Sequence, residues 1–375
     1  MKVVKARYLY DGEKILKDQY VAFDYEIKYV GPKKPEGEII AEGVVTPAFV
    51  DGHSHIGMDR AGEPYTESEA NEHMDSIYPL VRAIDSVYMD DHAFRESVEA
   101  GVLYSTVLPG SGNPIGGKAA LIRNFASNTR DAFVKEIGIK AALGYNPRST
   151  VEWHGKRPNT RMGAVALLRE NFTKAVKAKE LLRKKKKILE EIEPLTEVFM
   201  DILSGKYKMM IHLHKEDDLY TAIQLSKEFG FKFVVNHGLD IFRPEPFLEL
   251  KKNNIPLIYG PLDSHPYKVE LKHETWRNCR IVHESGVNFG MMSDHPVILQ
   301  RNIFLTMRHF IRFGMSKHEA VSRLTKSTAE IIGAEKLGSI RKGYLASLVV
   351  WNGDPFEFTS HPVNVIGEGK TVYEE

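Results

Sequence analysis

The stretch that decides the fold is TPAFVDGHSHIGMD, residues 46–59. It lies partly within an apolar run, Val44 to Val50, that we expect to form a β-strand, and it continues into His53 and His55. Alternate side chains of a strand point to the same face, so these two imidazoles should converge on one point. Two neutral imidazoles aimed at one point suit a divalent metal ion.

Other apolar runs follow along the chain, and most are separated by segments with a helical pattern. The eight runs are VVTPAFVDG, VLYSTVLPG, KAALIRN, EIGIKAALG, KMMIHLH, FKFVVNHG, IPLIYGP and VNFGMMSD. Eight strand–helix units predict an α/β fold, a (β/α)8 TIM barrel with a parallel inner sheet. One long helix is expected from Met162 to about Leu203, with the lysines at 184–187 on its solvated face. Both ends of the chain, by contrast, are rich in short strands and turns.

Composition narrows the class of protein. The chain has 51 basic and 50 acidic residues, a balance that gives no electrostatic footprint for nucleic acid or an anionic membrane. The single cysteine, Cys279, excludes an internal disulfide and a thiolate metal cage, so histidine and carboxylate must supply any metal ligands. The N-terminal segment lacks a signal peptide pattern, and no apolar run approaches the roughly 18 residues of a membrane span. We therefore expect a cytoplasmic protein.

Potential metal ligands stand at the ends of four of the predicted strands. They are His53 and His55 on the first, His212 and His214 on the fifth, His237 on the sixth and Asp294 on the eighth. A single histidine at a strand end is more often structural, but the carboxyl ends of barrel strands meet at one catalytic face. A divalent ion bound there would lower the pKa of its water toward neutrality. Asp294 would then act as a ligand and as the base that passes the proton to the leaving group.

Two longer stretches resemble the opening and closing motifs of the amidohydrolase superfamily of metal-dependent barrel hydrolases: VVTPAFVDGHSHI and LTKSTAEIIGAEKLGSIRKGYLASLVVWNGDP. The stretches PGSGNPIGGKAALIRN, KAALGYNPRST and NTRMGAVALLRE are similar to its imidazolonepropionase-related branch. The resemblance implies a hydrolase barrel over residues 47–334. It also implies a small β-sandwich domain formed by both termini, residues 1–46 and 335–375.

The resemblance further implies a set of metal ligands: His53, His55, His212, His237 and Asp294. Lys140 is the candidate for a carboxylated lysine that bridges two ions; a depressed pKa or outward packing are the alternatives for this lysine. Tyr145 stands where the branch often has Glu. The choice between His212 and His214 stays open, with His214 then a substrate contact. Zinc is the expected ion, as one or two per chain, and iron, manganese, cobalt or nickel suit the same ligands.

Candidate substrate-binding residues lie in the predicted loops. They are Asn113 and Lys118 after the second strand, Tyr145 and Arg148 after the fourth, Arg161 before the long helix and His265 after the seventh. Each could equally stabilise its own loop. Arg148 and Arg161 would suit a substrate carboxylate, because a guanidinium pairs with it as a fork.

The leading hypothesis is hydrolysis of a C–N bond, in an amide or cyclic amide of a small molecule. A ring-amidine deaminase of the same superfamily is the first alternative, but such members place Glu where this chain has Lys215. A non-catalytic scaffold is the second, and such relatives generally lose the ligands that this chain keeps. Neither nucleic acid nor a membrane is expected as a partner, and homo-oligomerisation stays open.

Overall fold

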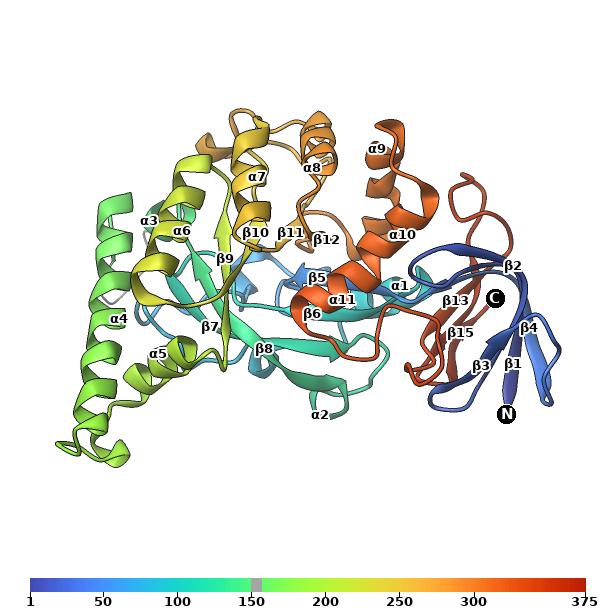
Figure 1. Ribbon diagram of the computed structural model, residues 1–375, viewed down its shortest axis with the longest axis horizontal. Helices are drawn as coiled ribbons and strands as arrows, with labels where there is room; N and C mark the ends of the chain where they lie inside the picture. Colours follow the sequence, from blue (N-terminus) through green and yellow to red (C-terminus); the bar gives the residue numbers. More distant parts are fainter. Residues whose placement is uncertain (150–156) are drawn as a thin grey trace.

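The computed structural model describes residues 1–149 and 157–375. Thr150, the last residue of the motif KAALGYNPRST, lies outside the described residues. The described chain builds one sheet of seven strands and one of eight. Figure 1 shows the seven-stranded sheet at one end of the molecule, where blue N-terminal and red C-terminal strands lie together.

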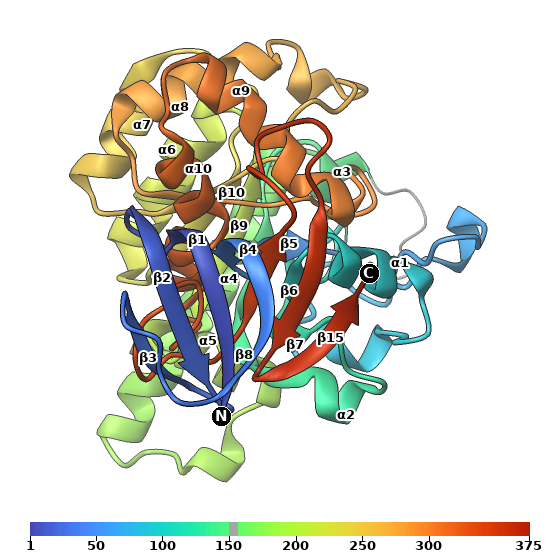
Figure 2. The ribbon, with the colours of Figure 1, turned by 90° about the vertical axis from the view of Figure 1, so that its right-hand side faces the viewer.

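Both ends of the chain contribute to the seven-stranded sheet, as predicted. Its order is β15-β14-β13-β4-β1-β2-β3, so β4 and β13 join the N-terminal strands to the C-terminal ones. Figure 2 looks onto this sheet, with the blue strands β1, β2 and β4 on one side and the red strand β15 at the other edge. An apolar cluster that includes Phe23, Val45, Leu348 and Val350 packs beneath it. The strands are β1 (Lys2–Tyr10), β2 (Ile15–Phe23), β3 (Ile27–Gly31), β4 (Glu38–Pro47), β13 (Leu348–Trp351), β14 (Pro362–Gly367) and β15 (Lys370–Glu374).

Each of the eight predicted apolar runs contributes a strand to the second sheet, which rolls into a nearly closed barrel. These are β5 (Phe49–Ser54), β6 (Val102–Val107), β7 (Ile115–Arg123), β8 (Phe133–Ala142), β9 (Lys208–Leu213), β10 (Phe233–His237), β11 (Leu257–Tyr259) and β12 (Phe289–Met291). They follow one another around the sheet in sequence order. At the seam between β12 and β5, the backbone N–H of Asp294 donates to His53 O (3.0 Å), and that of His55 donates to His295 O (3.0 Å).

The third barrel strand differs from the prediction of an all-parallel sheet. Strand β7 runs antiparallel to both β6 and β8, whereas the other neighbouring strands pair in parallel. Residues 108–114 join β6 to β7 directly and contain no helix. A connection this short permits a hairpin, because a parallel return needs a crossover of a dozen or more residues.

The predicted strand over Val44 to Val50 is divided between the two sheets. β4 ends at Pro47 in the seven-stranded sheet, and β5 begins at Phe49 in the barrel. Val349 on β13 pairs with Thr46, while Phe49 pairs with Val102 on β6. The apolar run is continuous because both sheets bury it, so hydrophobicity alone could not reveal the change of sheet.

The single long helix expected from Met162 to about Leu203 is two helices, α4 (Arg161–Arg183) and α5 (Pro194–Ser204). Residues 184–187, the four lysines, follow the end of α4 and are exposed, and Lys185 has φ +53°. Pro194 then begins α5 at a first-turn position, where a missing N–H costs nothing. The lysines are therefore solvated, as expected, but they lie between helices.

The remaining helices surround the barrel. They are α1 (His92–Glu99), α2 (Thr129–Ala132), α3 (Asn146–Ser149), α6 (Glu216–Phe229), α7 (Pro244–Lys252), α8 (Cys279–Ser285), α9 (Met307–Arg312), α10 (Lys317–Leu324) and α11 (Lys326–Ile332). Short 3-10 helices are η1 (Tyr65–Glu67), η2 (Ala83–Ser86), η3 (Leu189–Glu191), η4 (Val269–Leu271), η5 (Trp276–Asn278) and η6 (Gln300–Thr306). Among the described residues, no helix combines the length and apolarity that crossing a membrane requires.

Candidate metal centre

The first ligand cluster lies where the barrel seam closes. His53 ends β5 together with Ser54, His55 follows directly, and Asp294 follows β12. The Nε2 atoms of His53 and His55 each lie 3.3 Å from Oδ1 of Asp294. Asp294 has φ +51°, a backbone conformation that L-residues seldom adopt and that the seam hydrogen bonds hold in place. The predicted convergence of the two imidazoles is found, with a carboxylate between them.

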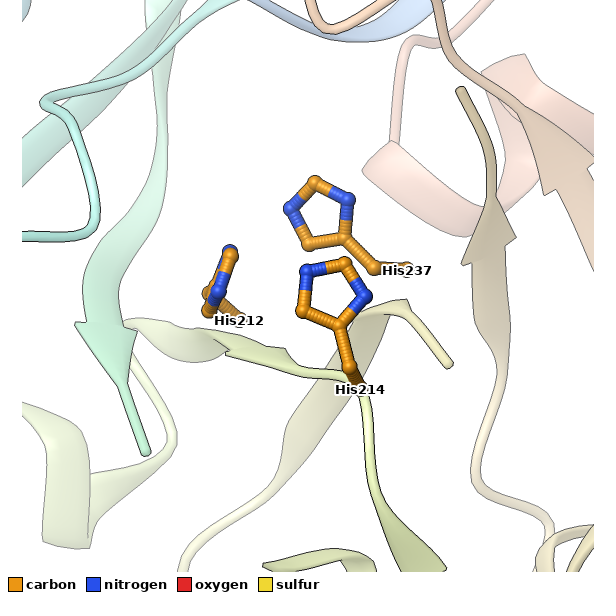
Figure 3. Close-up of side chains that lie close together, drawn as sticks. All are labelled: His212, His214 and His237. Atoms are coloured by element: carbon orange, nitrogen blue, oxygen red, sulfur yellow. The ribbon is translucent and has the colours of Figure 1, made fainter. Parts of the chain in front are cut away.

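The second cluster consists of His212, His214 and His237. Their candidate ligand atoms lie within 4.8 Å of one another, and Figure 3 shows the three rings gathered at the ends of β9 and β10. All three side chains are buried. Within the described part of the chain, the Nε2 atoms of these histidines have no hydrogen-bond partner. Because an unpaired buried polar atom costs about 1–3 kcal/mol, the cluster is built for a group that would satisfy these atoms.

Lys140 on β8 lies beside the first cluster. It is fully buried, and its Nζ is 3.2 Å from Nε2 of His53. The rings of His53 and His237 are 5.0 Å apart between centroids, so the two clusters are adjacent. Burial lowers the pKa of Lys140 to about 7, with Asp294 opposing the shift. Outward packing of Lys140 is thereby excluded, and much of its amine is neutral near neutral pH.

Four of the five histidines in the two clusters have the protonation state that a metal requires. Burial lowers the pKa of His53 to about 3. Burial also lowers the pKa values of His212, His214 and His237 well below the ordinary range. Metal ligation uses neutral imidazole, so these residues need not lose a proton before binding. Nitrogen and oxygen donors of this kind, with buried unpaired atoms, fit a divalent ion of the zinc type.

Hydrogen bonds fix which ring nitrogen faces each cluster. Nδ1 of His55 lies 2.9 Å from Leu108 O, and Nδ1 of His237 lies 2.9 Å from Gly260 O. A carbonyl can only accept, so each Nδ1 carries the proton and leaves Nε2 free as a ligand atom. For His53 the partner of Nδ1 is the side-chain amide of Asn236, at 2.6 Å.

A buried carboxylate ties the first cluster to the seam. Asp51 on β5 accepts hydrogen bonds from the backbone N–H groups of His53 (3.2 Å) and Ser293 (3.0 Å). Its other oxygen accepts from the hydroxyl of Ser293 and from Nε2 of Gln300 at 2.7 Å. Burial raises the pKa of Asp51 to about 6 against these hydrogen bonds. Asp51 thus joins β5 to the segment after β12, the two elements that carry the first cluster.

Sequence reasoning missed Glu270, which lies in the turn η4 after the seventh barrel strand. Its side chain is buried, and Oε1 lies 3.7 Å from Nε2 of His212 and 3.9 Å from Nε2 of His214. His265, chosen from the same loop, is exposed. The sequence around Glu270 indicates its position only weakly, because KVELK has the composition of an ordinary solvated turn.

A cavity of about 530 Å³ opens over the clusters. His55, His212 and Asp294 line it, so both clusters are accessible from the same space. Polar and aromatic groups around it include Asn71, Ser111, Tyr145, Asn146, Tyr267 and Lys268. Among the described residues that line the cavity, Lys268 is the one lysine or arginine, and its Nζ lies 3.9 Å from Oε1 of Glu270.

The predicted substrate residues divide into two groups. Tyr145 lines the cavity, and His214 belongs to the second cluster. Arg161 pairs instead with Asp218 at 2.7 Å and lines a separate cavity of about 800 Å³ beside α4. Arg148 lies over the ring of Tyr145, 5.2 Å from its centroid.

Two other predicted residues have partners outside the cavity. The amide of Asn113 is buried and donates to the carbonyl oxygens of Glu72 and Asp75, at 3.0 Å each. Lys118 lies 3.6 Å from a carboxylate oxygen of Glu136. Asn113 thus supports the loop structure, which was the alternative stated for each of these residues.

Comparisons with a family profile, a related sequence and solved structures all indicate the same family. Residues 199–372 match the sequence profile of the Amidohydrolase family. The chain is similar to the amidohydrolase tasK of Hapsidospora irregularis, with 27% identity over 373 residues, 91% of this chain but 38% of that protein's length. It is also similar to the crystal structure of an amidohydrolase from Thermotoga maritima MSB8, with 31% identity, full coverage of both chains and a TM-score of 0.92. A Xaa-Pro dipeptidase with bound methionine shares the fold, with a TM-score of 0.61 at 15% identity over both full chains.

Proposed function

Because this chain belongs to the amidohydrolase superfamily and is a hydrolase of that superfamily, we propose the finer assignment that it cleaves a C–N bond in an amide or cyclic amide. The substrate is a small molecule that fits a cavity of about 530 Å³. The same proposal includes zinc as the ion, carboxylation of Lys140, membership of the imidazolonepropionase-related branch and a cytoplasmic location.

One observation carries this proposal: two ligand clusters flank a fully buried lysine beneath one accessible cavity. His53, His55 and Asp294 would hold one ion, and His212, His214 and His237 supply donors for a second. Nζ of Lys140, 3.2 Å from Nε2 of His53, stands where a carboxylated side chain could reach both. A neutral amine is the form that reacts with carbon dioxide, and the lowered pKa of Lys140 favours it.

The bound ions would supply a water of lowered pKa and would polarise the substrate carbonyl. Asp294 lines the cavity, so its carboxylate can reach the reacting groups. It would take a proton from the attacking water and deliver it to the leaving nitrogen, which then departs as a neutral amine. The Nδ1 hydrogen bonds of His55 and His237 hold their rings in place while the substrate changes shape.

The deaminase alternative is disfavoured by the partners of Lys215. This residue stands where ring deaminases carry Glu, and its Nζ pairs with Asp240 at 2.8 Å. Its charge is therefore engaged in an ion pair with Asp240. The scaffold alternative predicts a chain that holds no metal, so metal content separates it from both enzyme hypotheses.

The test is turnover by the zinc-loaded protein on N-acyl amino acids, lactams, hydantoins and aminated heterocycles. We expect an acid and an amine from the amides or cyclic amides, and a loss of at least about 100-fold in kcat for Asp294→Asn. Asp263→Asn is the matched control, because Asp263 is exposed and pairs with Arg308. Ammonia released from the heterocycles alone would replace the proposal with deamination.

A further inference from the structure

Glu270 is a buried carboxylate with one oxygen that lacks a hydrogen-bond partner among the described residues. Its side chain is 2% exposed. One oxygen, Oε2, accepts a hydrogen bond of 2.8 Å from the backbone N–H of Tyr145. The other, Oε1, has no hydrogen-bond partner in the described part of the chain. Nζ of Lys268 is 3.9 Å from Oε1, which is beyond hydrogen-bond distance. Oε1 thus has an ion-pair partner in Lys268 but no hydrogen-bond donor, and a bound cation in direct contact would satisfy this buried oxygen.

The atoms opposite Oε1 are also without partners. Nε2 of His212 is 3.7 Å away and Nε2 of His214 is 3.9 Å away, and neither has a hydrogen-bond partner among the described residues. Ligand atoms about 2.0–2.2 Å from one tetrahedral ion lie roughly 3.3–3.6 Å from each other. Both distances from Oε1 therefore exceed this range by only a few tenths of an ångström.

The backbone makes room for this carboxylate. Gly144 has φ +85°, and a Cβ there would lie 2.7 Å from Oε2 of Glu270 and 3.0 Å from Oδ2 of Asp218. Any side chain at position 144 would displace Glu270 from the histidines. Asp218 is paired with Arg161 at 2.7 Å, whereas Glu270 has a carboxylate oxygen within 4 Å of both His212 and His214.

We propose that Glu270 is a ligand of the second ion, and that the second cluster holds its metal through histidine nitrogens together with the Oε1 atom of this carboxylate. The inference rests on the proposed function, since it presupposes that the clusters bind metal. It assigns to the loop after β11 a direct role in holding the ion, in addition to any contact with substrate.

The test is metal binding by the full-length Glu270→Gln variant, measured as zinc per chain after titration and dialysis and, separately, as the absorption spectrum of the cobalt-loaded protein. Gln keeps the volume and removes the anionic oxygen. We expect loss of the second ion, with its Kd raised at least tenfold, and retention of the first. Glu274→Gln is the matched control, because Glu274 lies in the same segment and bonds to Ser264 (3.1 Å).

The outcomes separate the two proposals. If the wild-type chain binds no metal, the proposed function fails and this inference with it. If the wild type binds two ions and Glu270→Gln binds both with unchanged affinity, the role of Glu270 is refuted while the hydrolase proposal stands. Should Glu270→Gln fail to fold, Glu270→Asp keeps the charge with a shorter reach, and equal affinity for the second ion in that variant would refute the inference.

Discussion

Replacing Asn236 tests whether the orientation of His53 controls the first metal site. Asn236 lies on β10 and is fully buried, with its amide nitrogen Nδ2 2.6 Å from Nδ1 of His53. Nε2 of His53 faces Asp294 and Lys140. Ligation through Nε2 requires a proton on Nδ1, so the amide of Asn236 must turn over and present its oxygen, Oδ1, in place of Nδ2 to accept that proton. That orientation also gives Oδ1 of Asn236, which otherwise lacks a partner among the described residues, a hydrogen bond.

The size of the effect follows from this one hydrogen bond. In Asn236→Ala the Nδ1–H of His53 remains buried without a partner, at a cost of about 1–3 kcal/mol. Each 1.4 kcal/mol is about tenfold in affinity, so the first ion should bind roughly 5-fold to 140-fold more weakly. Asn236→Asp places a carboxylate in the same position and should preserve or tighten binding, since it raises the basicity of the imidazole.

The assay is metal titration against a chelator of known affinity, with both sites followed. Asn278→Ala is the control, because this buried amide donates to Leu239 O (3.1 Å) and His273 O (2.9 Å), away from the clusters. We expect the control to lose stability but not affinity for metal. First-site affinity of Asn236→Ala within twofold of the wild type would refute the role given to this hydrogen bond.

Three further outcomes are expected. In Gly52→Ala the new Cβ would lie 2.8 Å from Cγ2 of Ile258 and 2.9 Å from Met291 O. Overpacking of about 1–3 kcal/mol should therefore lower Tm by about 1–4 °C. An unchanged Tm would contradict the close packing around Gly52. Burial raises the pKa of Glu274 to about 7, so folding favours its protonated form, and stability falls as pH rises from about 4.5 to 7. The Tm of Glu274→Gln relative to that of the wild type should therefore rise between pH 5 and 8. A Tm difference that stays constant over this range would contradict the raised pKa of Glu274. Chelation should lower Tm by several degrees, since metal at 1,000 times Kd contributes about 4 kcal/mol.

The sequence predicted most of the barrel because each strand is an apolar run bounded by turns. Periodicity carries no direction, however, so the antiparallel setting of β7 could not be read from KAALIRN. The feature of the sequence that indicates an antiparallel β7 is the length of the connection at residues 108–114, which contains no helix and is too short for a parallel crossover. The division of the run from Val44 to Val50 was hidden for a similar reason, because both sheets bury their part of it.

The clustering of the histidines and Asp294 at the strand ends could be predicted because the fold brings those ends together. The positions of the candidate substrate-binding residues in the loops could not be predicted in this way, because they depend on turns that the sequence specifies weakly. Arg161 looked suited to a substrate carboxylate, yet Asp218, 57 residues further along, holds it beside α4. Glu270 was overlooked in the same way, because nothing in KVELK indicates that its side chain turns inward.

The most direct test of the account is the number of metal ions per purified chain in the wild type and in Lys140→Ala. Lys135→Ala is the control, because Lys135 lies on the same strand and contacts Gly333 O. The account predicts close to two ions in the wild type and in the control, falling to one or none in Lys140→Ala. Near one ion in all three proteins would contradict the bridged centre and reopen the case for a deaminase, and no metal in any of them, even after reconstitution, would contradict both enzyme hypotheses.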